Sequence, residues 1–208
     1  MTIEKGSDWG EPWDEHGAVA PVEVDGDAEL AALVDPAAGS PPVATVNAGD
    51  LLRTLGLDRP RPAGERHRYP IDAVVARLRR PDGAEIDACF VAHLTVRNRP
   101  LTGIGPGLSL AVMNAAWLGP LRLGPRAHPN DGVVDVTEGT VGLLQRPEAN
   151  RRAASGAHLP HPQLRTRRGA TWETSWSRPV AVWLDGVERG RFDAVRVEVH
   201  PDALALVV

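Results

Sequence analysis

The sequence predicts an α+β protein, with a reduced N-terminal α/β lobe and a larger, mostly antiparallel, β-sandwich-like C-terminal domain. Residues 18–57 alternate short apolar strands with helical patterns, which is typical of an α/β layer. Beyond residue 66 apolar and polar residues alternate between turn signals, which favours antiparallel strands. We place an arm at 1–17, the reduced lobe at 18–57 and the β-rich domain at 58–208, with the Pro- and Arg-rich stretch 58–66 at the boundary.

Composition limits the classes of function. The chain has 208 residues, enough for one large domain or two small lobes, and a formal net charge of -4. That charge argues against nucleic acid as a partner. A single cysteine excludes an intrachain disulfide. No apolar run approaches the roughly 20 residues that span a membrane, and no signal peptide is evident, so we expect a cytoplasmic protein without a transmembrane segment.

The N-terminal elements follow from periodicity and from cap residues. The arm carries Trp9 and Trp13, which either pin it to the body, as we expect, or cover a partner surface. We expect strands at 18–24 and 41–46 and helices at 27–34 and 49–57. Asp27 is a cap residue for the first helix, and Gly56 ends the second.

The β-rich domain opens with a predicted hairpin. Tyr69–Leu78 and Ile86–Val96 flank the turn at 81–83. The remaining expected elements are a glycine-rich connection at 101–107, strands at 108–118 and 133–141, a helix at 143–154, and three or four strands from residue 172 to the end.

The segment PRAHPNDGVVDV, at 125–136, contains a strong turn signal and by itself indicates an exposed turn between strands. With Asn114 and Gly119 upstream, it resembles a motif of the diacylglycerol kinase and bacterial lipid kinase family, which shares its fold with NAD kinases. The resemblance implies a structural Mg²⁺ held by the Asp131 carboxylate and by the main-chain oxygens of His128 and Val133. Oxygen ligands suit this hard cation.

A second motif, VAVWLDGVERG at 180–190, is a strand, an Asp-Gly turn and a strand. It resembles the family's D-G-E segment, whose Glu is the catalytic base. The resemblance makes Asp185 and Glu188 the candidate catalytic residues. The Glu position itself holds Val187, which cannot accept a proton, and Glu188 would need a bulge to reach the same face of the strand.

Two further motifs lie in the small lobe. Residues 23–30 and 44–57 are similar to the family's G-G-D-G-T-L and G-T-x-N-D-x-A-R-x-L-G motifs, and imply that Gly26, Asp27 and Asn47 bind ATP. The loop has lost glycines that let backbone N–H groups approach phosphate. Glu29 would place a carboxylate where the triphosphate lies.

Six arginines lie between residues 146 and 168. They indicate either a phosphate or lipid-headgroup patch or a solvated surface in an arginine-rich chain. They are Arg146, Arg151, Arg152, Arg165, Arg167 and Arg168.

Three functional hypotheses remain open. The first is a divergent lipid kinase-like protein, catalytically impaired, that binds a ligand or a partner. The second is an active ATP-dependent lipid kinase that phosphorylates a lipid hydroxyl, with Asp27 contacting nucleotide-bound Mg²⁺. The third is an assembly subunit of a full-length kinase. The implied partners are a lipid or phosphorylated small molecule, a peripheral membrane contact, a second copy of the chain or a kinase subunit.

Overall fold

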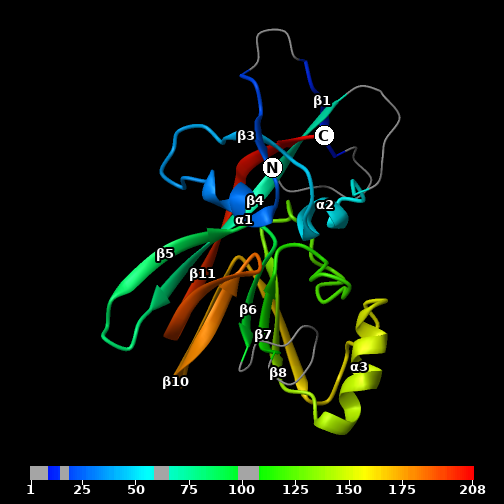
Figure 1. The fold of residues 1–208 in the computed structure, drawn as a ribbon, viewed down its shortest axis with the longest axis vertical. Coiled ribbons are helices and arrows are strands. Elements are labelled where there is room, and N and C mark those ends of the chain that lie inside the picture. The colour runs from blue at the N-terminus through cyan, green and yellow to red at the C-terminus, as the bar shows by residue number, and fades with distance from the viewer. Residues whose placement is uncertain (1–8, 15–18, 59–65, 98–107) are drawn as a thin grey trace.

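The computed structural model describes residues 9–14, 19–58, 66–97 and 108–208, and it confirms the predicted fold class (Figure 1). The strands are β1 (Glu11–Pro12), β2 (Val22–Val24), β3 (Val43–Val46), β4 (His67–Arg79), β5 (Glu85–Phe90), β6 (His93–Arg97), β7 (Leu108–Met113), β8 (Val134–Gly139), β9 (Leu164–Gly169), β10 (Thr171–Leu184) and β11 (Val187–Val207). The helices are α1 (Asp27–Ala32), α2 (Asp50–Thr54), the 3-10 helix η1 (Leu143–Gln145) and α3 (Arg146–Ala153). Among the described residues one sheet runs in the order β1-β4-β11-β10-β6-β7-β8-β9.

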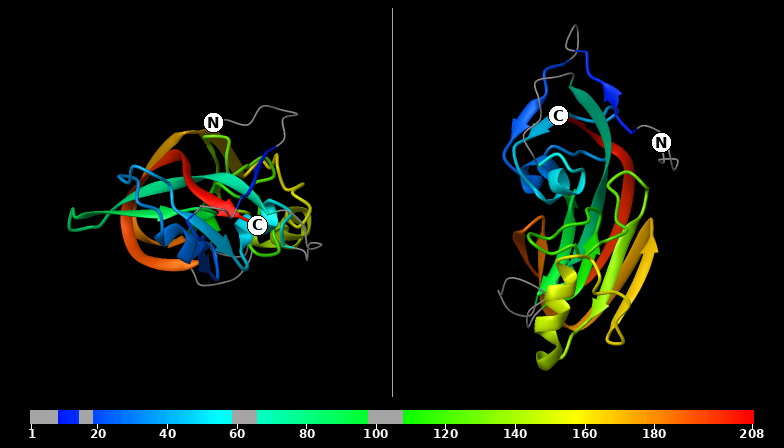
Figure 2. Two further views of the ribbon diagram at one scale, coloured as in Figure 1. Left: turned by 90° about the horizontal axis from the view of Figure 1, so that it is seen from above. Right: turned by 90° about the vertical axis from the view of Figure 1, so that its right-hand side faces the viewer.

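Two long strands join the lobes. The antiparallel pair of β4 and β11 extends from the β-rich domain into the small lobe (Figure 2). There β3 pairs in parallel with the end of β11, and β2 pairs in parallel with β3. The lobes therefore share one sheet, and the sequence signal at 58–66 does not correspond to a break in it. Residues 59–65 themselves, like the glycine-rich connection at 101–107, lie outside the described residues.

The strand expected at 86–96 is two strands. β5 ends at Phe90 and pairs with β4, whereas β6 begins at His93 and pairs with β10 and β7. The N–H groups of residues 91–93 donate to the Asp185 carboxylate instead of continuing the ladder with β4. An uninterrupted apolar run gives no sign of such an exchange of partners.

The C-terminal part contains fewer and longer strands than the sequence predicts. β10 and β11 each cover the length of two expected strands. The register shifts within the pair β10–β11 and within the pair β4–β11. β9 was not expected, because it is an edge strand whose side chains are mostly exposed and carry no apolar pattern. The helix expected at 143–154 forms as η1 and α3, with Pro147 in the first turn of α3.

The N-terminal arm is held to the body. The Trp9 ring lies 4.9 Å from that of Tyr69 and 4.8 Å from that of His128, and β1 pairs with the start of β4. The backbone N–H of Trp13 donates to the carbonyl of Arg66 at 2.7 Å. Trp9 therefore pins the described part of the arm through its ring, whereas Trp13 is held through its backbone N–H.

Three apolar clusters fill the fold. The largest lies within the β-rich domain and includes Phe90 and Phe192. A second lies beneath the short helices, around Leu30 and Leu51, and a third packs α3 against residues 111–127. None of the described helices is long and apolar enough to span a membrane.

Buried Asn114 ties these layers together at the end of β7. Its side-chain amide donates to the carbonyl of Val91 at 2.7 Å and to that of Asp72 at 3.0 Å. These bonds join β7 to the β5–β6 break and to β4. They also explain why the strand expected at 108–118 ends at Met113.

We expect Asn114→Ala to lower the free energy of unfolding by about 2–4 kcal/mol, because two buried carbonyls lose their donor. Urea denaturation followed by circular dichroism measures this. Asn47→Ala is the matched control, since Asn47 is exposed and bonds only to exposed carboxylates, at 3.2 and 3.4 Å. A loss at position 114 no larger than that of the control would contradict the role given to Asn114.

Candidate functional site

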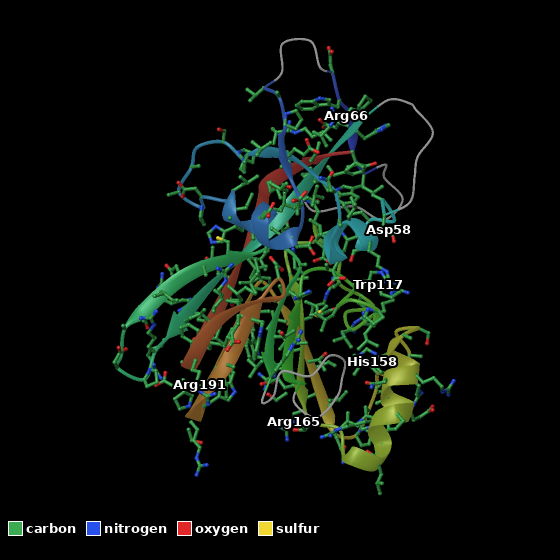
Figure 3. The ribbon with its side chains drawn as sticks, in the orientation of Figure 1. Asp58, Arg66, Trp117, His158, Arg165 and Arg191 are labelled. Carbon is green, nitrogen blue, oxygen red and sulfur yellow. The ribbon has the colours of Figure 1, made fainter. Side chains whose placement is uncertain are left out.

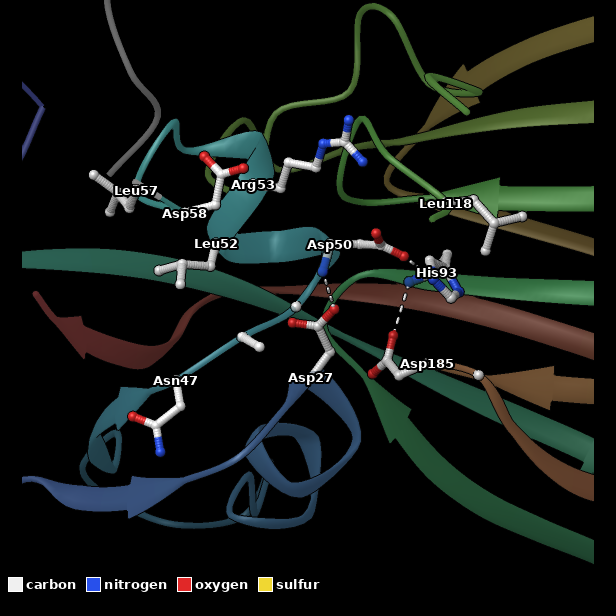
Figure 4. Close-up of a pocket in the computed structure, with 13 residues that line it drawn as sticks. Asp27, Asn47, Asp50, Leu52, Arg53, Leu57, Asp58, His93, Leu118 and Asp185 are labelled. Atoms are coloured by element: carbon white, nitrogen blue, oxygen red, sulfur yellow. Dashed lines mark hydrogen bonds and ion pairs between the residues drawn. The ribbon is translucent and has the colours of Figure 1, made fainter. Parts of the chain in front are cut away.

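An open cleft of about 780 Å³ lies where the small lobe meets the β-rich domain (Figure 4). α2 and the end of β3 form one side, and the Asp185-Gly186 turn and the start of β6 form the other. Its described lining residues are Asp27, Asn47, Ala48, Gly49, Asp50, Leu52, Arg53, Leu57, Asp58, His93, Leu118, Asp185 and Gly186.

Asp185 sits at the tightest turn of the site. Asp185 and Gly186 have φ angles of 47° and 81°, and they connect β10 to β11 as a two-residue hairpin turn. The Asp185 carboxylate accepts the N–H groups of Val91 at 2.9 Å, of Ala92 at 2.9 Å and of His93 at 2.8 Å. Both of its oxygens therefore hold the backbone of the β5–β6 break.

Asp27 performs a similar task for α2. One carboxylate oxygen accepts the N–H groups of Asp50 at 2.7 Å and of Leu51 at 3.3 Å. Gly49 has a φ angle of 147°, and a Cβ atom there would collide with the Asp27 carboxylate. Only glycine allows this close approach. The first N–H groups of α2 are thus satisfied from inside the protein.

His93 and Asp50 form an ion pair inside the cleft. His93 Nε2 lies 3.0 Å from the Asp50 carboxylate, which also accepts the N–H of Gly119. Burial lowers the pKa of His93, but the hydrogen bond with Asp50 and the charge of Asp185 outweigh burial, and the pKa is raised. Burial raises the pKa of Asp50, but His93 and the N–H of Gly119 outweigh it, and the pKa is lowered.

The pKa values of Asp27 and Asp185 are both raised, in each case first of all by burial. Burial, and then the nearby charge of Asp185, raise the pKa of Asp27 to about 7, against the N–H bonds from α2. Its other carboxylate oxygen, Oδ1, is buried without a hydrogen-bond partner among the described residues. At neutral pH this carboxyl group therefore exists in both protonation states.

Arg53, on α2, also lines the cleft. Its guanidinium donates to the carbonyl of Gly119 at 2.7 Å and lies 3.8 Å from the centre of the Trp117 ring. Trp117 and Asp58 project on the same side of the molecule (Figure 3). These contacts fix the guanidinium against the β-rich domain.

Two of the three residues expected to bind nucleotide lie in the cleft. Asp27 and Asn47 line the cleft, but Gly26 does not. The Asn47 amide donates to the carboxylates of Glu23 and Asp25, while Glu29 accepts the backbone N–H of Asp25 at 2.9 Å. Glu29 thus closes the first turn of α1 and does not line the cleft.

The residues after the Asp-Gly turn also lie apart from the cleft. Val187 and Glu188 are both exposed, and neither lines it. Glu188 pairs across the hairpin with Trp183, and Val187 with Leu184. The register of β10 against β11 does shift between Val182 and Trp183, beside Glu188, but Glu188 stays exposed and does not line the cleft. His93 was missed from the sequence, because one histidine in the run CFVAHL has no recognisable spacing to a partner.

The expected Mg²⁺ ligands lie on the loop between β7 and β8, outside the cleft. The two Asp131 carboxylate oxygens accept from the Arg168 guanidinium and from the N–H of Val133. His128 Nδ1 accepts the N–H of Asn130 at 3.2 Å. No cluster of three or more His, Cys, Asp or Glu side chains in the described part could hold a metal ion. A guanidinium bound to the one carboxylate ligand does not fit a cation at that position.

A shared-sheet β domain that meets a small α/β lobe at an acidic cleft defines the class of NAD-kinase-like folds. Residues 93–208 match the family described as the YegS C-terminal NAD kinase beta sandwich-like domain, and the chain belongs to this family. The match begins at His93, so it covers β6 to β11 and more than half of the chain.

Solved structures show the same fold. A proposed diacylglycerol kinase from Bacillus anthracis strain Sterne is 13% identical, with a TM-score of 0.55 over 79% of this chain and 69% of that one. Yeast NADH kinase in complex with NADH is 7% identical, with a TM-score of 0.52 over 88% of this chain and 60% of that one. No curated protein matches the sequence.

The raised pKa of Asp27 predicts a pH-dependent stability. The folded-state pKa of about 7 exceeds the ordinary aspartate pKa of 3.8, so the folded state binds the extra proton between these values and stability falls as pH rises. Ionised Asp27 costs roughly 4 kcal/mol by this linkage. We expect the free energy of unfolding of Asp27→Asn to fall less steeply than that of the wild type between about pH 5 and 6.5. Above this range His93, whose pKa is also raised, adds a further loss of stability as pH rises.

Urea denaturation across that pH range measures the slope. Asp58→Asn is the matched control, because Asp58 also lines the cleft but is exposed, and it should keep the wild-type slope. If Asp27→Asn keeps that slope as well, the assignment of the proton to Asp27 is wrong.

Proposed function

We propose that this member of the lipid and NAD kinase-like family binds a ligand in its cleft and does not transfer phosphate. One observation carries the proposal: the two carboxylates that would serve nucleotide binding and catalysis are bonded to the backbone. Asp27 holds the first N–H groups of α2, and Asp185 holds those of residues 91–93. Neither can leave these partners without exposing buried N–H groups, which is costly.

The charge of the cleft argues against a triphosphate. Four aspartates line the cleft, and the basic residues that line it are Arg53 and His93. His93 is already paired with Asp50. Phosphate sites in such folds use free N–H groups at a loop and helix N-terminus. In this chain the N–H groups of Asp50 and Leu51 are occupied by Asp27, so an incoming phosphate would meet a carboxylate.

The position of the general base supports the same conclusion. A lipid hydroxyl must lose its proton to a group within hydrogen-bonding reach as it attacks phosphate. Val187 has no such group, and Glu188 points to an exposed position of the hairpin opposite Trp183. The turn therefore offers no base to a substrate in the cleft.

The cleft favours a ligand that donates hydrogen bonds. Asp27 is only 8% exposed, and its Oδ1 atom is buried without a partner among the described residues. Because this oxygen is itself shielded from solvent, the acceptors open to a ligand are the other carboxylates that line the cleft. A hydroxyl-bearing headgroup can donate hydrogen bonds to them, whereas a fully ionised phosphate cannot.

We expect no binding of Mg-ATP or Mg-ADP at millimolar concentration in isothermal titration calorimetry. We also expect no transfer of labelled phosphate to dispersed diacylglycerol. A full-length bacterial diacylglycerol kinase is the positive control for both measurements. Micromolar binding of Mg-ATP together with lipid phosphorylation would refute the proposal.

One observation favours the alternative of an active lipid kinase. A carboxyl group with a pKa of about 7 and an unoccupied oxygen is suited to act as a general base at neutral pH, and Asp27 has both properties. Under this alternative Asp27→Asn abolishes phosphorylation while Asp58→Asn retains it. Under our proposal neither the wild type nor the variants phosphorylate diacylglycerol, so the wild-type assay separates the two.

A further inference from the structure

The loop between β7 and β8 braces the irregular point of the longest strand. β11 shifts register against β4 between His200 and Leu204, and Asp202 there has a φ angle of 53°. The Asp72 carboxylate accepts the N–H of Gly132 at 2.8 Å and that of Asp202 at 3.1 Å. The Asn130 amide donates to Asp202 at 2.8 Å. The loop thus contacts both long strands where they separate.

Two carboxylates under this loop require a positive charge. The side chains of Asp131 and Asp135 are 17% and 9% exposed, and Asp131 lies beside the bracing residues Asn130 and Gly132. Burial of such carboxylates is unfavourable without a cationic partner. A divalent cation or a basic side chain could supply it.

Arg168 supplies that charge from the edge strand β9. Its backbone lies opposite Asp135 in the β8–β9 ladder. The Nη2 atom of Arg168 donates to the Asp131 carboxylate, and its Nε atom lies 3.3 Å from the Asp135 carboxylate. Arg126 also approaches the Asp135 carboxylate, at 3.8 Å. Arg168 is therefore the guanidinium that contacts both carboxylates.

We propose that Arg168 takes the place of a divalent cation at this loop, so that the fold of the protein is independent of Mg²⁺ and Ca²⁺. The planar guanidinium spans both carboxylates at once, which a lysine ammonium cannot do with the same geometry. The backbone ladder of β9 places Arg168 directly opposite Asp135. The other Asp131 oxygen is occupied by the N–H of Val133.

The wild-type protein provides the first test, by thermal melting in EDTA, in MgCl2 and in CaCl2. Weak protein sites for these cations have dissociation constants of up to about 1 mM, so about 10 mM occupies them. At about ten times its dissociation constant, even such a weak site would raise Tm by roughly 3–6 °C in a chain of this length. We expect the three Tm values to agree. A rise in either salt would overturn the proposal.

Arg168→Ala provides the second test, with Arg167→Ala on the same strand as the matched control. We expect Arg168→Ala to melt at least about 4 °C below the control, since two nearly buried carboxylates lose their shared partner. We also expect MgCl2 or CaCl2 to restore part of this loss. Equal Tm values for the two variants, or no response of Arg168→Ala to either cation, would contradict the proposal.

A double-mutant cycle keeps the test informative if Arg168→Ala does not fold. Arg168→Lys keeps the charge but not the fork, and Asp131→Asn removes one partner. We expect the Tm losses of Arg168→Lys and Asp131→Asn to be non-additive in the double variant, because both break the same contact. Additive losses would show that the two residues act separately and would overturn the assignment.

Discussion

The carboxylate of Asp185 holds three consecutive backbone N–H groups where the sheet passes from one lobe to the other. Because those groups turn to Asp185, the chain leaves β5 and begins β6 beside a different neighbour. This change of partner carries His93 to the cleft, where it pairs with Asp50 at the start of α2. The geometry of the cleft thus follows from the contacts of one turn residue, which gives Asp185 a structural role that needs no catalytic partner after it.

Much of the fold could be predicted from local chemistry. Helices around Leu30 and Leu51, the hairpin at Pro81-Asp82-Gly83 and the Asp-Gly turn at 185–186 each have a signal within a few residues. β9 could not be found in this way, since an exposed edge strand rich in arginine has no apolar period. The break at 91–92 depends on a carboxylate more than ninety residues away, which no local pattern reports.

The candidate site was less predictable than the fold. The motifs correctly indicated that Asp27, Asn47 and Asp185 line one cleft. They did not indicate that the carboxylates of Asp27 and Asp185 bond to the backbone, because residue identity does not reveal which partner a carboxylate chooses. The partner of the Asp131 carboxylate could not be predicted either, because Arg168 lies on β9, a strand that the sequence does not predict. In each case the partner of the carboxylate is a group of the same chain.

The continuity of β4 and β11 through both lobes limits how the molecule can move. Proteins that close around a ligand usually do so about a hinge made of a few unpaired residues. In this chain a paired ribbon crosses the junction, and its register shift near Asp202 is clamped by Asp72 and Asn130. Domain closure by rotation would strain hydrogen bonds on both long strands at once. The cleft is consequently preformed, and under the proposed function it would select a ligand by shape and charge and not by enclosing it.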